Sequence, residues 1–138
     1  MADKTLPDIA KAMRHIDIAM LSTVSADGAI AGRPMSNNRD VDFDGDTYFF
    51  TSAKMPVAAE IAANPQVGLA YQGHHHLFVS VSGKAELVRD KAAFEAHWTP
   101  DLDKWFDQGV DTPDLAMIHV KAEKLEYWDG KDQGEIRL

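Results

Sequence analysis

The sequence predicts a mainly β protein, an antiparallel barrel with short peripheral helices. Six or seven short segments are rich in β-branched and aromatic residues or alternate apolar with polar residues. Most of them are joined by tight turns, and the helical patterns between them are brief. Because a barrel of this size is largely filled by side chains, we expect a ligand on its outer surface or between subunits.

The strands are expected where apolar or alternating runs lie between turn residues, at 16–24, 29–37, 47–52, 66–72, 77–88, 115–121 and 124–128. A tight turn is expected at 25–28, because Gly28 can adopt a positive φ. Pro34 lacks an amide hydrogen, so the second strand must lie at a sheet edge or carry a bulge. The residues after Gly130 are polar, and we expect a loose tail there.

Helices are expected at 5–16, 55–63 and 90–98, with a further helical turn at 101–106. Thr5 can cap the first helix and Asp90 the third, since both side chains can accept a hydrogen bond from a first-turn amide. The second helix is expected to stop at Asn64 and Pro65.

Length and charge narrow the class of protein. A chain of 138 residues suits one domain, 1–138, with its core over about 13–130. The net charge is −8, and the 14 basic residues are scattered singly, which argues against a nucleic-acid partner. No apolar run approaches the roughly 18 residues of a membrane span, and residues 1–13 lack the apolar core of a signal peptide, so we expect a cytoplasmic protein. Cysteine is absent, which excludes disulfides, thiolate zinc sites and cysteine nucleophiles.

Two segments carry cations that could hold an anion. Arg33 lies in a strand of otherwise small, mostly apolar residues, where it is either an edge-strand arginine in a surface ion pair or a fork of donors for an anion. Thr51, Ser52 and Lys54 lie where the third strand gives way to a helix. Hydroxyls, a lysine and free amides at a helix start suit a phosphate, although Thr51 or Ser52 could simply cap the helix.

Trp128 ends the last aromatic strand segment. It is either an ordinary core tryptophan or a cover for a planar ring.

Taken in order, these segments resemble the pyridoxamine 5′-phosphate oxidase-like split barrels, and most closely the bacterial general stress protein subgroup. The resemblance covers roughly residues 13–130. It lies in the segments 33–35, 48–54, 61–69, 81–86 and 126–130, and in the shorter segments 105–109 and 112–115.

The resemblance implies a six-stranded antiparallel split barrel, a homodimer with FMN bound across the subunit interface. It implies that Arg33 and Lys54 lie near the FMN phosphate, beside a hydroxyl-bearing turn made of Thr51 and Ser52. Near the isoalloxazine ring it implies Met35, Ser36 and Phe50. It also implies that Trp128 of the second subunit approaches the edge of the ring. A phosphate dianion on an acidic protein needs such local cations.

The chain departs from the vitamin B6 oxidases of this family. Arg33 is followed only by Pro34 and Met35 rather than by a longer basic motif, and their C-terminal arginine–histidine segment has no counterpart after Gly130. We therefore do not expect pyridoxine 5′-phosphate oxidation. Two functions stay open: an FMN-dependent oxidoreductase with a small-molecule redox partner, or a stress protein that binds or sequesters flavin without turnover. No catalytic acid or base is evident.

Two metal patterns are weaker than their alternatives. Residues 40–45 resemble the start of an EF-hand, but position 12 is Thr51 rather than a bidentate glutamate, which favours a hairpin turn. Adjacent strand residues point to opposite faces, so at most two of His74, His75 and His76 converge, and an exposed loop is expected. His97 and His119 are expected to be structural or to lie at the dimer interface.

Overall fold

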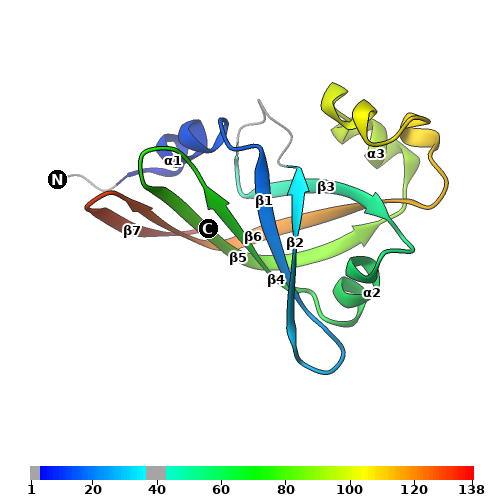
Figure 1. Ribbon diagram of the computed structural model, residues 1–138, viewed down its shortest axis with the longest axis horizontal. Helices are drawn as coiled ribbons and strands as arrows, with labels where there is room; N and C mark the ends of the chain where they lie inside the picture. The colour runs from blue at the N-terminus through cyan, green and yellow to red at the C-terminus, as the bar shows by residue number, and fades with distance from the viewer. Residues whose placement is uncertain (1–3, 37–42) are drawn as a thin grey trace.

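The computed structural model of this chain describes residues 4–36 and 43–138, whose strands form one antiparallel sheet. The strand order is β2-β1-β4-β5-β6-β3, and β7 pairs with the far end of β6 (Figure 1). The strands are β1 (Ile18–Val24), β2 (Ile30–Ser36), β3 (Asp46–Ser52), β4 (Gln66–Gln72), β5 (Leu77–Val88), β6 (Leu115–Asp129) and β7 (Asp132–Arg137). The predicted mainly β split barrel is confirmed.

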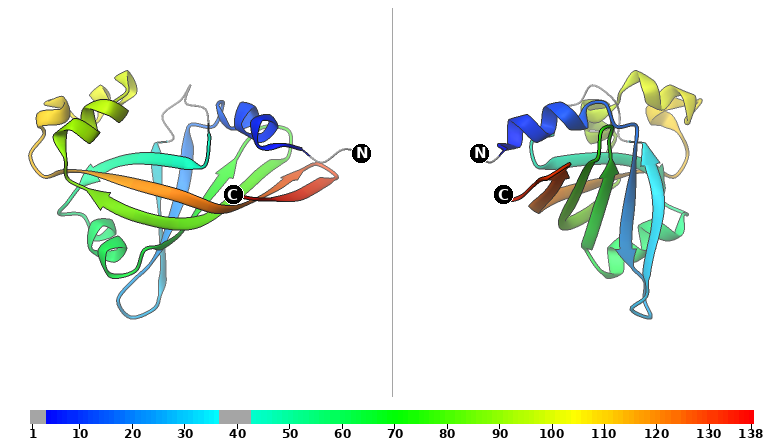
Figure 2. Two further views of the ribbon diagram at one scale, coloured as in Figure 1. Left: turned by 180° about the vertical axis from the view of Figure 1, so that it is seen from behind. Right: turned by 60° about the vertical axis from the view of Figure 1, so that its left-hand side comes forward.

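The sheet is strongly twisted but not closed. Strands β2 and β3 end the strand order, and within the described ranges they pair only with β1 and β6, respectively. Figure 2 shows β3 crossing over the other strands and the β1–β2 hairpin projecting from the body. Pro34 therefore lies in an edge strand, as predicted, where a missing amide donor is tolerated.

Three α-helices are seen in the described part of the chain: α1 (Leu6–Met13), α2 (Pro56–Ala63) and α3 (Lys91–His97). Two 3₁₀ turns follow α3, η1 (Pro100–Lys104) and η2 (Gly109–Asp111). The predicted caps are confirmed, since Thr5 accepts a hydrogen bond from the Asp8 amide at 3.4 Å and Asp90 accepts one from the Ala93 amide at 3.1 Å. No described helix is both long enough and apolar enough to cross a membrane.

Two apolar clusters hold these elements together. The larger one fills the inside of the sheet, where alternate residues such as Leu21, Leu69 and Leu125 are buried, and α1 and α2 pack against it. The smaller one joins β3 and β6 to α3 and the turn η1, and its buried members are Phe50, Phe94, Leu102, Leu115 and Met117. The second cluster matters for function because it fixes the segment that follows α3.

Strand β6 is continuous, whereas the sequence predicted a break between residues 121 and 124. Ser82 of β5 faces Lys124 and Gly83 faces Ala122, so Glu123 is the extra residue of a bulge. The polar residues at this point mark the bulge rather than the end of a strand. Gly83 is required there, since a Cβ atom would collide with the carbonyl oxygen of Lys121.

The expected loose tail is wrong, because residues after Gly130 form β7. The strand pairs with β6 over its whole length, and Ile136 packs against the main core. Gly134 lies directly over the buried ring of Tyr127, so the backbone can approach only where no side chain intervenes. Polar composition hid this strand, because one of its faces is open to water.

We predict that Gly134→Ala destabilises the fold by about 1–3 kcal/mol, since its Cβ would lie 2.5 Å from Cζ of Tyr127, a ring that is buried and cannot retreat. Urea denaturation would measure the loss. The matched control is Gln133→Ala on the exposed face of the same strand, for which we expect a change within about 0.5 kcal/mol. Equal stability of the two variants would show that β7 does not depend on this contact.

Candidate functional site

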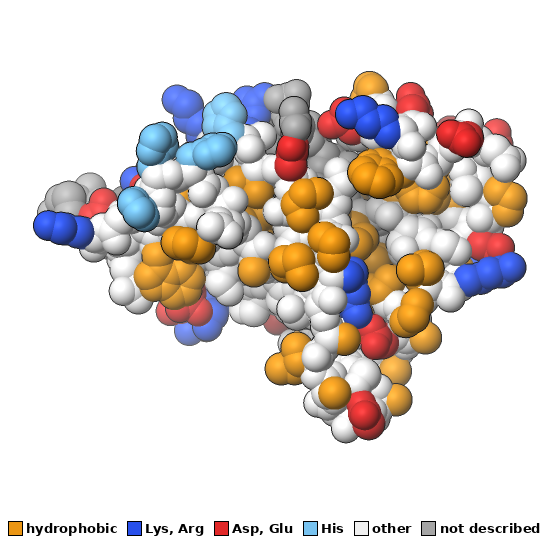
Figure 3. All heavy atoms as spheres, in the orientation of Figure 1, with side chains coloured by type: hydrophobic (Ala, Val, Ile, Leu, Met, Phe, Trp, Pro, Cys, Tyr) orange, Lys and Arg blue, Asp and Glu red, His pale blue; other side chains and the backbone are white. Residues whose placement is uncertain are grey.

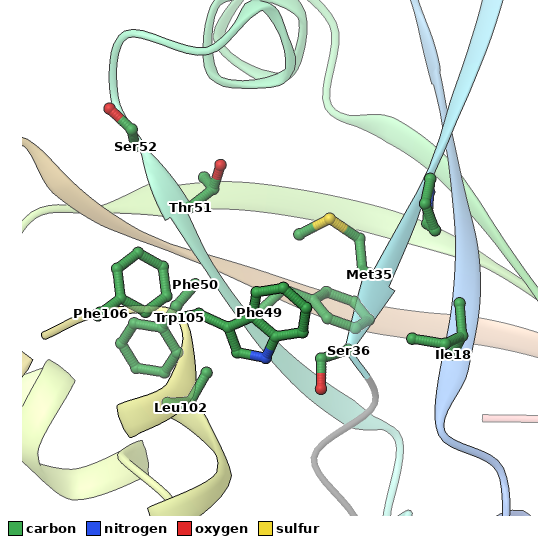
Figure 4. A pocket seen from close by; sticks show the side chains of 11 residues that line it. Ile18, Met35, Ser36, Phe49, Phe50, Thr51, Ser52, Leu102, Trp105 and Phe106 are labelled. Carbon is green, nitrogen blue, oxygen red and sulfur yellow. The ribbon is translucent and has the colours of Figure 1, made fainter.

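A cavity of about 440 Å³ lies between the two sheet edges, β2 and β3 (Figure 4). It is closed on a third side by the 3₁₀ turn η1 and the residues that follow it. The lining residues are Ile18, Pro34, Met35, Ser36, Phe49, Phe50, Thr51, Ser52, Leu102, Trp105 and Phe106. This volume is within the range of roughly 300–1,000 Å³ that holds cofactor-sized molecules.

The third wall is held firmly by the smaller apolar cluster. Leu102 is buried in that cluster, and the Trp98 ring packs edge-on against Phe50 with ring centroids 5.1 Å apart. The Trp98 indole N–H donates a hydrogen bond to Asp103 at 3.0 Å. These contacts place Trp105 at the rim of the cavity, where 68% of its surface is exposed. Figure 4 shows its indole extending toward the space between β3 and β2.

The chemistry of the walls is apolar and aromatic with a few hydroxyl groups. Ser36, Thr51 and Ser52 supply these hydroxyls, and the other lining side chains are hydrocarbon, thioether or aromatic. None of the lining residues has a side chain that titrates near neutral pH. The walls can therefore bind a planar, largely apolar group, but they offer no general acid or base.

Five of the eight residues assigned by resemblance line the cavity. They are Met35, Ser36, Phe50, Thr51 and Ser52. The sequence reasoning missed the third wall, although the segment 105–109 was part of the resemblance. Exposure is what singles out Trp105, and exposure cannot be read from sequence.

Lys54 follows the lining residue Ser52 by two positions but does not itself line the cavity. Its ammonium is 3.3 Å from the Asp114 carboxylate, and its side chain is 79% exposed, so this ion pair is weak and the cation stays accessible. The expectation of free amides is wrong for residues 53–55, between β3 and α2. The amides of Ala53, Lys54 and Met55 all donate hydrogen bonds to other groups of the chain. Neither hydroxyl caps α2, whose N-cap is Met55.

Arg33 does not line the cavity, although the next residue does. Its guanidinium donates to the Glu60 carboxylate at 2.7 Å, to the Thr23 hydroxyl at 2.8 Å and to the Leu21 carbonyl at 3.2 Å. The Arg33 and Glu60 side chains are only 23% and 17% exposed. The edge-strand arginine is thus in an ion pair, as one of the two interpretations held, but the pair is largely buried.

Trp128 lies away from the cavity of its own chain. It pairs in register with Phe78 of β5 and Gln133 of β7, and it is half-buried. It is also absent from both apolar clusters, so it is not an ordinary core residue.

His97 and His119 do not reach the cavity either. Both rings stack on Tyr48, with centroid distances of 3.6 and 4.8 Å. The two ring nitrogens of His119 face Asp46 at 2.8 Å and Glu86 at 3.1 Å. Burial lowers the pKa of His119, but the hydrogen bonds to both carboxylates outweigh it, and the pKa lies above its ordinary value. His119 therefore links β6 to β3 and β5.

The described residues give no support to a metal site at either the EF-hand-like segment or the histidine run. Residues 74–76 form the exposed loop between β4 and β5, as expected. The expected turn at 40–45 falls largely outside the described residues, although the Asp44 carboxylate accepts the Asp46 amide at 3.0 Å just before β3. In the described ranges, no group of three histidine, aspartate or glutamate side chains is placed to hold a metal ion.

Comparison with known proteins identifies the lineage of this fold. Residues 4–137 match the family described as pyridoxamine 5′-phosphate oxidase like. The chain belongs to that family. General stress protein 26 of Bacillus subtilis is 29% identical over 129 residues, a match that covers 90% of this chain and 88% of the relative.

Solved structures of two other proteins have a similar fold. A general stress FMN/FAD binding protein from Xanthomonas citri is 26% identical, with a TM-score of 0.77 over 96% of this chain and 94% of its own. A protein from Clostridium acetobutylicum related to general stress protein 26 has a TM-score of 0.85 at 17% identity, over 100% of this chain and 97% of its own. At that identity the likeness shows the fold alone.

The raised pKa of His119 predicts a contribution to stability that depends on pH. Because the folded-state pKa is raised, the bridge stabilises the fold below the unfolded-state pKa of about 6.5, and the contribution is lost as pH rises through the folded-state value. We predict that His119→Gln lowers the free energy of unfolding by up to about 1 kcal/mol near pH 6 and by much less near pH 9.

Denaturant titrations at several pH values would measure this difference. The control is His74→Gln, because His74 is exposed in the β4–β5 loop. A loss for His119→Gln that does not vary with pH would contradict the bridge.

Proposed function

We propose that this chain is an FMN-binding flavoprotein whose cofactor lies in the cavity between β2 and β3. The observation that carries the proposal is the cavity lining: aromatic and thioether walls that suit a flat heterocycle, with hydroxyls at the end nearest an accessible lysine. Membership of the pyridoxamine 5′-phosphate oxidase-like family supports it, as does the relative from Xanthomonas citri that is named as an FMN/FAD binding protein.

The residues present fit the two parts of FMN. Met35, Phe50 and Trp105 would contact the ring system, while Thr51, Ser52 and Lys54 would hold the phosphate end. When bound, FMN would supply the electron transfer. The chain itself would bind and orient the ring and exclude water from one side of it, because its cavity walls carry no group that could take up a proton.

We propose an oxidoreductase with a small-molecule redox partner, acting in the cytoplasm as part of a stress response. The lack of a titratable group among the lining residues favours one other function, a protein that binds or sequesters flavin without turnover. Anaerobic addition of NADH or NADPH to the flavin-loaded protein separates the two. Bleaching of the flavin absorbance supports the oxidoreductase, and a spectrum that no donor changes supports the binding protein.

We also propose that a second copy of the chain covers the outer face of the sheet. Figure 3 shows hydrophobic side chains gathered over β1 and β2 on this face. Ile18 and Met20 of β1 and Phe78 of β5 are 48%, 43% and 44% exposed, and a contiguous patch of exposed apolar side chains is typical of an interface. Ile18 also lines the cavity, so a partner on this face would lie beside the bound ring, where Trp128 of that partner is expected to approach it.

The flavin site is tested by titration of the purified protein, stripped of ligand, with FMN and with riboflavin in phosphate-free buffer, followed by flavin fluorescence and calorimetry. We predict that Trp105→Ala weakens both flavins about tenfold, or about 1.4 kcal/mol, because the indole contacts the ring that they share.

The matched control is Ile30→Ala, which removes another exposed large side chain at the far end of β2, where Ile30 is 80% exposed. We expect it to leave both affinities unchanged. If the wild-type protein binds neither flavin, the proposed function is wrong. If flavin binds and Trp105→Ala has no effect, the cavity is not where the ring lies.

The dimer is tested by Met20→Glu, which places a charge in the middle of the exposed apolar face. Wild-type protein is expected to have twice the chain mass of 15.2 kDa in light scattering, and the variant is expected to be a monomer with weakened flavin binding. Asp27→Asn in the β1–β2 turn is the control and should remain a dimer. A monomeric wild-type protein would remove the shared-site proposal.

A further inference from the structure

The Arg33–Glu60 pair changes what the proposed flavin site can select. We infer that Glu60 withholds the Arg33 guanidinium from the cofactor phosphate, so that the preference of the site for FMN over riboflavin depends mainly on Lys54 and is smaller than two available cations would give. This inference rests on the proposed function and concerns the charge at one end of that same site.

The contacts form a closed polar network between three elements. Arg33 of β2 donates to the Glu60 carboxylate of α2 at 2.7 Å and to the Thr23 hydroxyl of β1 at 2.8 Å. The Thr23 hydroxyl in turn donates to the same Glu60 oxygen at 3.0 Å. Thr23 is 1% exposed and is the buried polar residue of the described core. Arg33, Thr23 and Glu60 each hydrogen-bond to the other two, so the network needs no ligand to complete it.

Releasing Arg33 toward a phosphate would be costly. The Glu60 side chain is 17% exposed, and a carboxylate so shielded from water loses its counter-charge when the guanidinium turns away. If Arg33 instead stays in place, the pair is neutral and offers a phosphate dianion no net positive charge. In both cases Glu60 reduces the gain in affinity that the phosphate would bring.

Lys54 shows the opposite arrangement. The side chains of Lys54 and its partner Asp114 are 79% and 41% exposed. The ammonium and carboxylate are 3.3 Å apart, so water and salt already screen that pair. A phosphate could replace Asp114 at little cost. We therefore expect the phosphate preference of the protein to depend mainly on Lys54, with Arg33 as a strand clamp that Glu60 keeps occupied.

The test is the ratio of the riboflavin and FMN dissociation constants, measured by titration of the full chain. This ratio is insensitive to a loss of folded protein, because such a loss weakens both flavins equally. We expect Glu60→Gln to raise the preference for FMN at least fivefold, and Lys54→Ala to lower it at least fivefold. Thr23→Val is the matched control, since it removes both hydrogen bonds of the Thr23 hydroxyl in the same network without changing the charge, and the ratio should stay constant.

A double-mutant cycle separates release of Arg33 from simple removal of a negative charge. Glu60→Gln in the Arg33→Ala background should change the ratio less than twofold. A ratio that Glu60→Gln leaves unchanged, or raises equally with and without Arg33, would overturn the inference while flavin binding itself stands. If wild-type protein binds neither flavin, the proposed function fails first, and the inference fails with it.

Discussion

The sheet of this protein does not close, and its candidate site depends on that constraint. Strands β2 and β3 end the order of hydrogen-bonded strands, so each presents one edge that no described strand covers. Exposed edges must be protected, and here the turn η1 and the side chains beside it do so. Side chains cannot fill the gap as completely as a paired strand would, and the remaining space is the cavity. An edge strand also tolerates Pro34, which a central strand would not.

The second apolar cluster turns this gap into a defined site. Phe50 faces the cavity and also packs against Phe94 and Trp98, so a wall of the site is part of a core. The 3₁₀ turn is anchored through Leu102, and it can therefore hold an exposed tryptophan in place. A ring that binds against such a wall loses little free energy to ordering side chains, because the cluster has already ordered them. Phe50 and Leu102 thus belong both to the cavity wall and to the core.

Local chemistry made much of this fold predictable. Thr5 and Asp90 cap helices because their side chains need only a neighbouring amide, and the β1–β2 turn needs only a glycine at position 28, where φ is +84°. What could not be predicted depends on distant neighbours. The bulge at Glu123 follows from Gly83 on another strand, and β7 follows from Tyr127 beneath Gly134. Polarity alone made both segments resemble loops, since polar residues also occupy the open face of a strand.

The same distinction explains the site. Met35, Ser36, Phe50, Thr51 and Ser52, which the resemblance assigns to a flavin site, line one cavity because they follow one another along two strands that both border it. A cation is different, because its value to an anionic ligand depends on its own partner. Arg33 is 27 residues from Glu60 in sequence, and only the packing of α2 on β1, the strand that pairs with β2, brings the two together. In a chain with a net charge of −8, carboxylates are plentiful. A basic residue in the right motif can therefore be paired with a carboxylate of the chain as readily as it can be left accessible to an anionic ligand. Of the two cations that the resemblance assigns to a phosphate, Lys54 is the one whose side chain stays exposed in this structure, because Arg33 is enclosed together with Glu60.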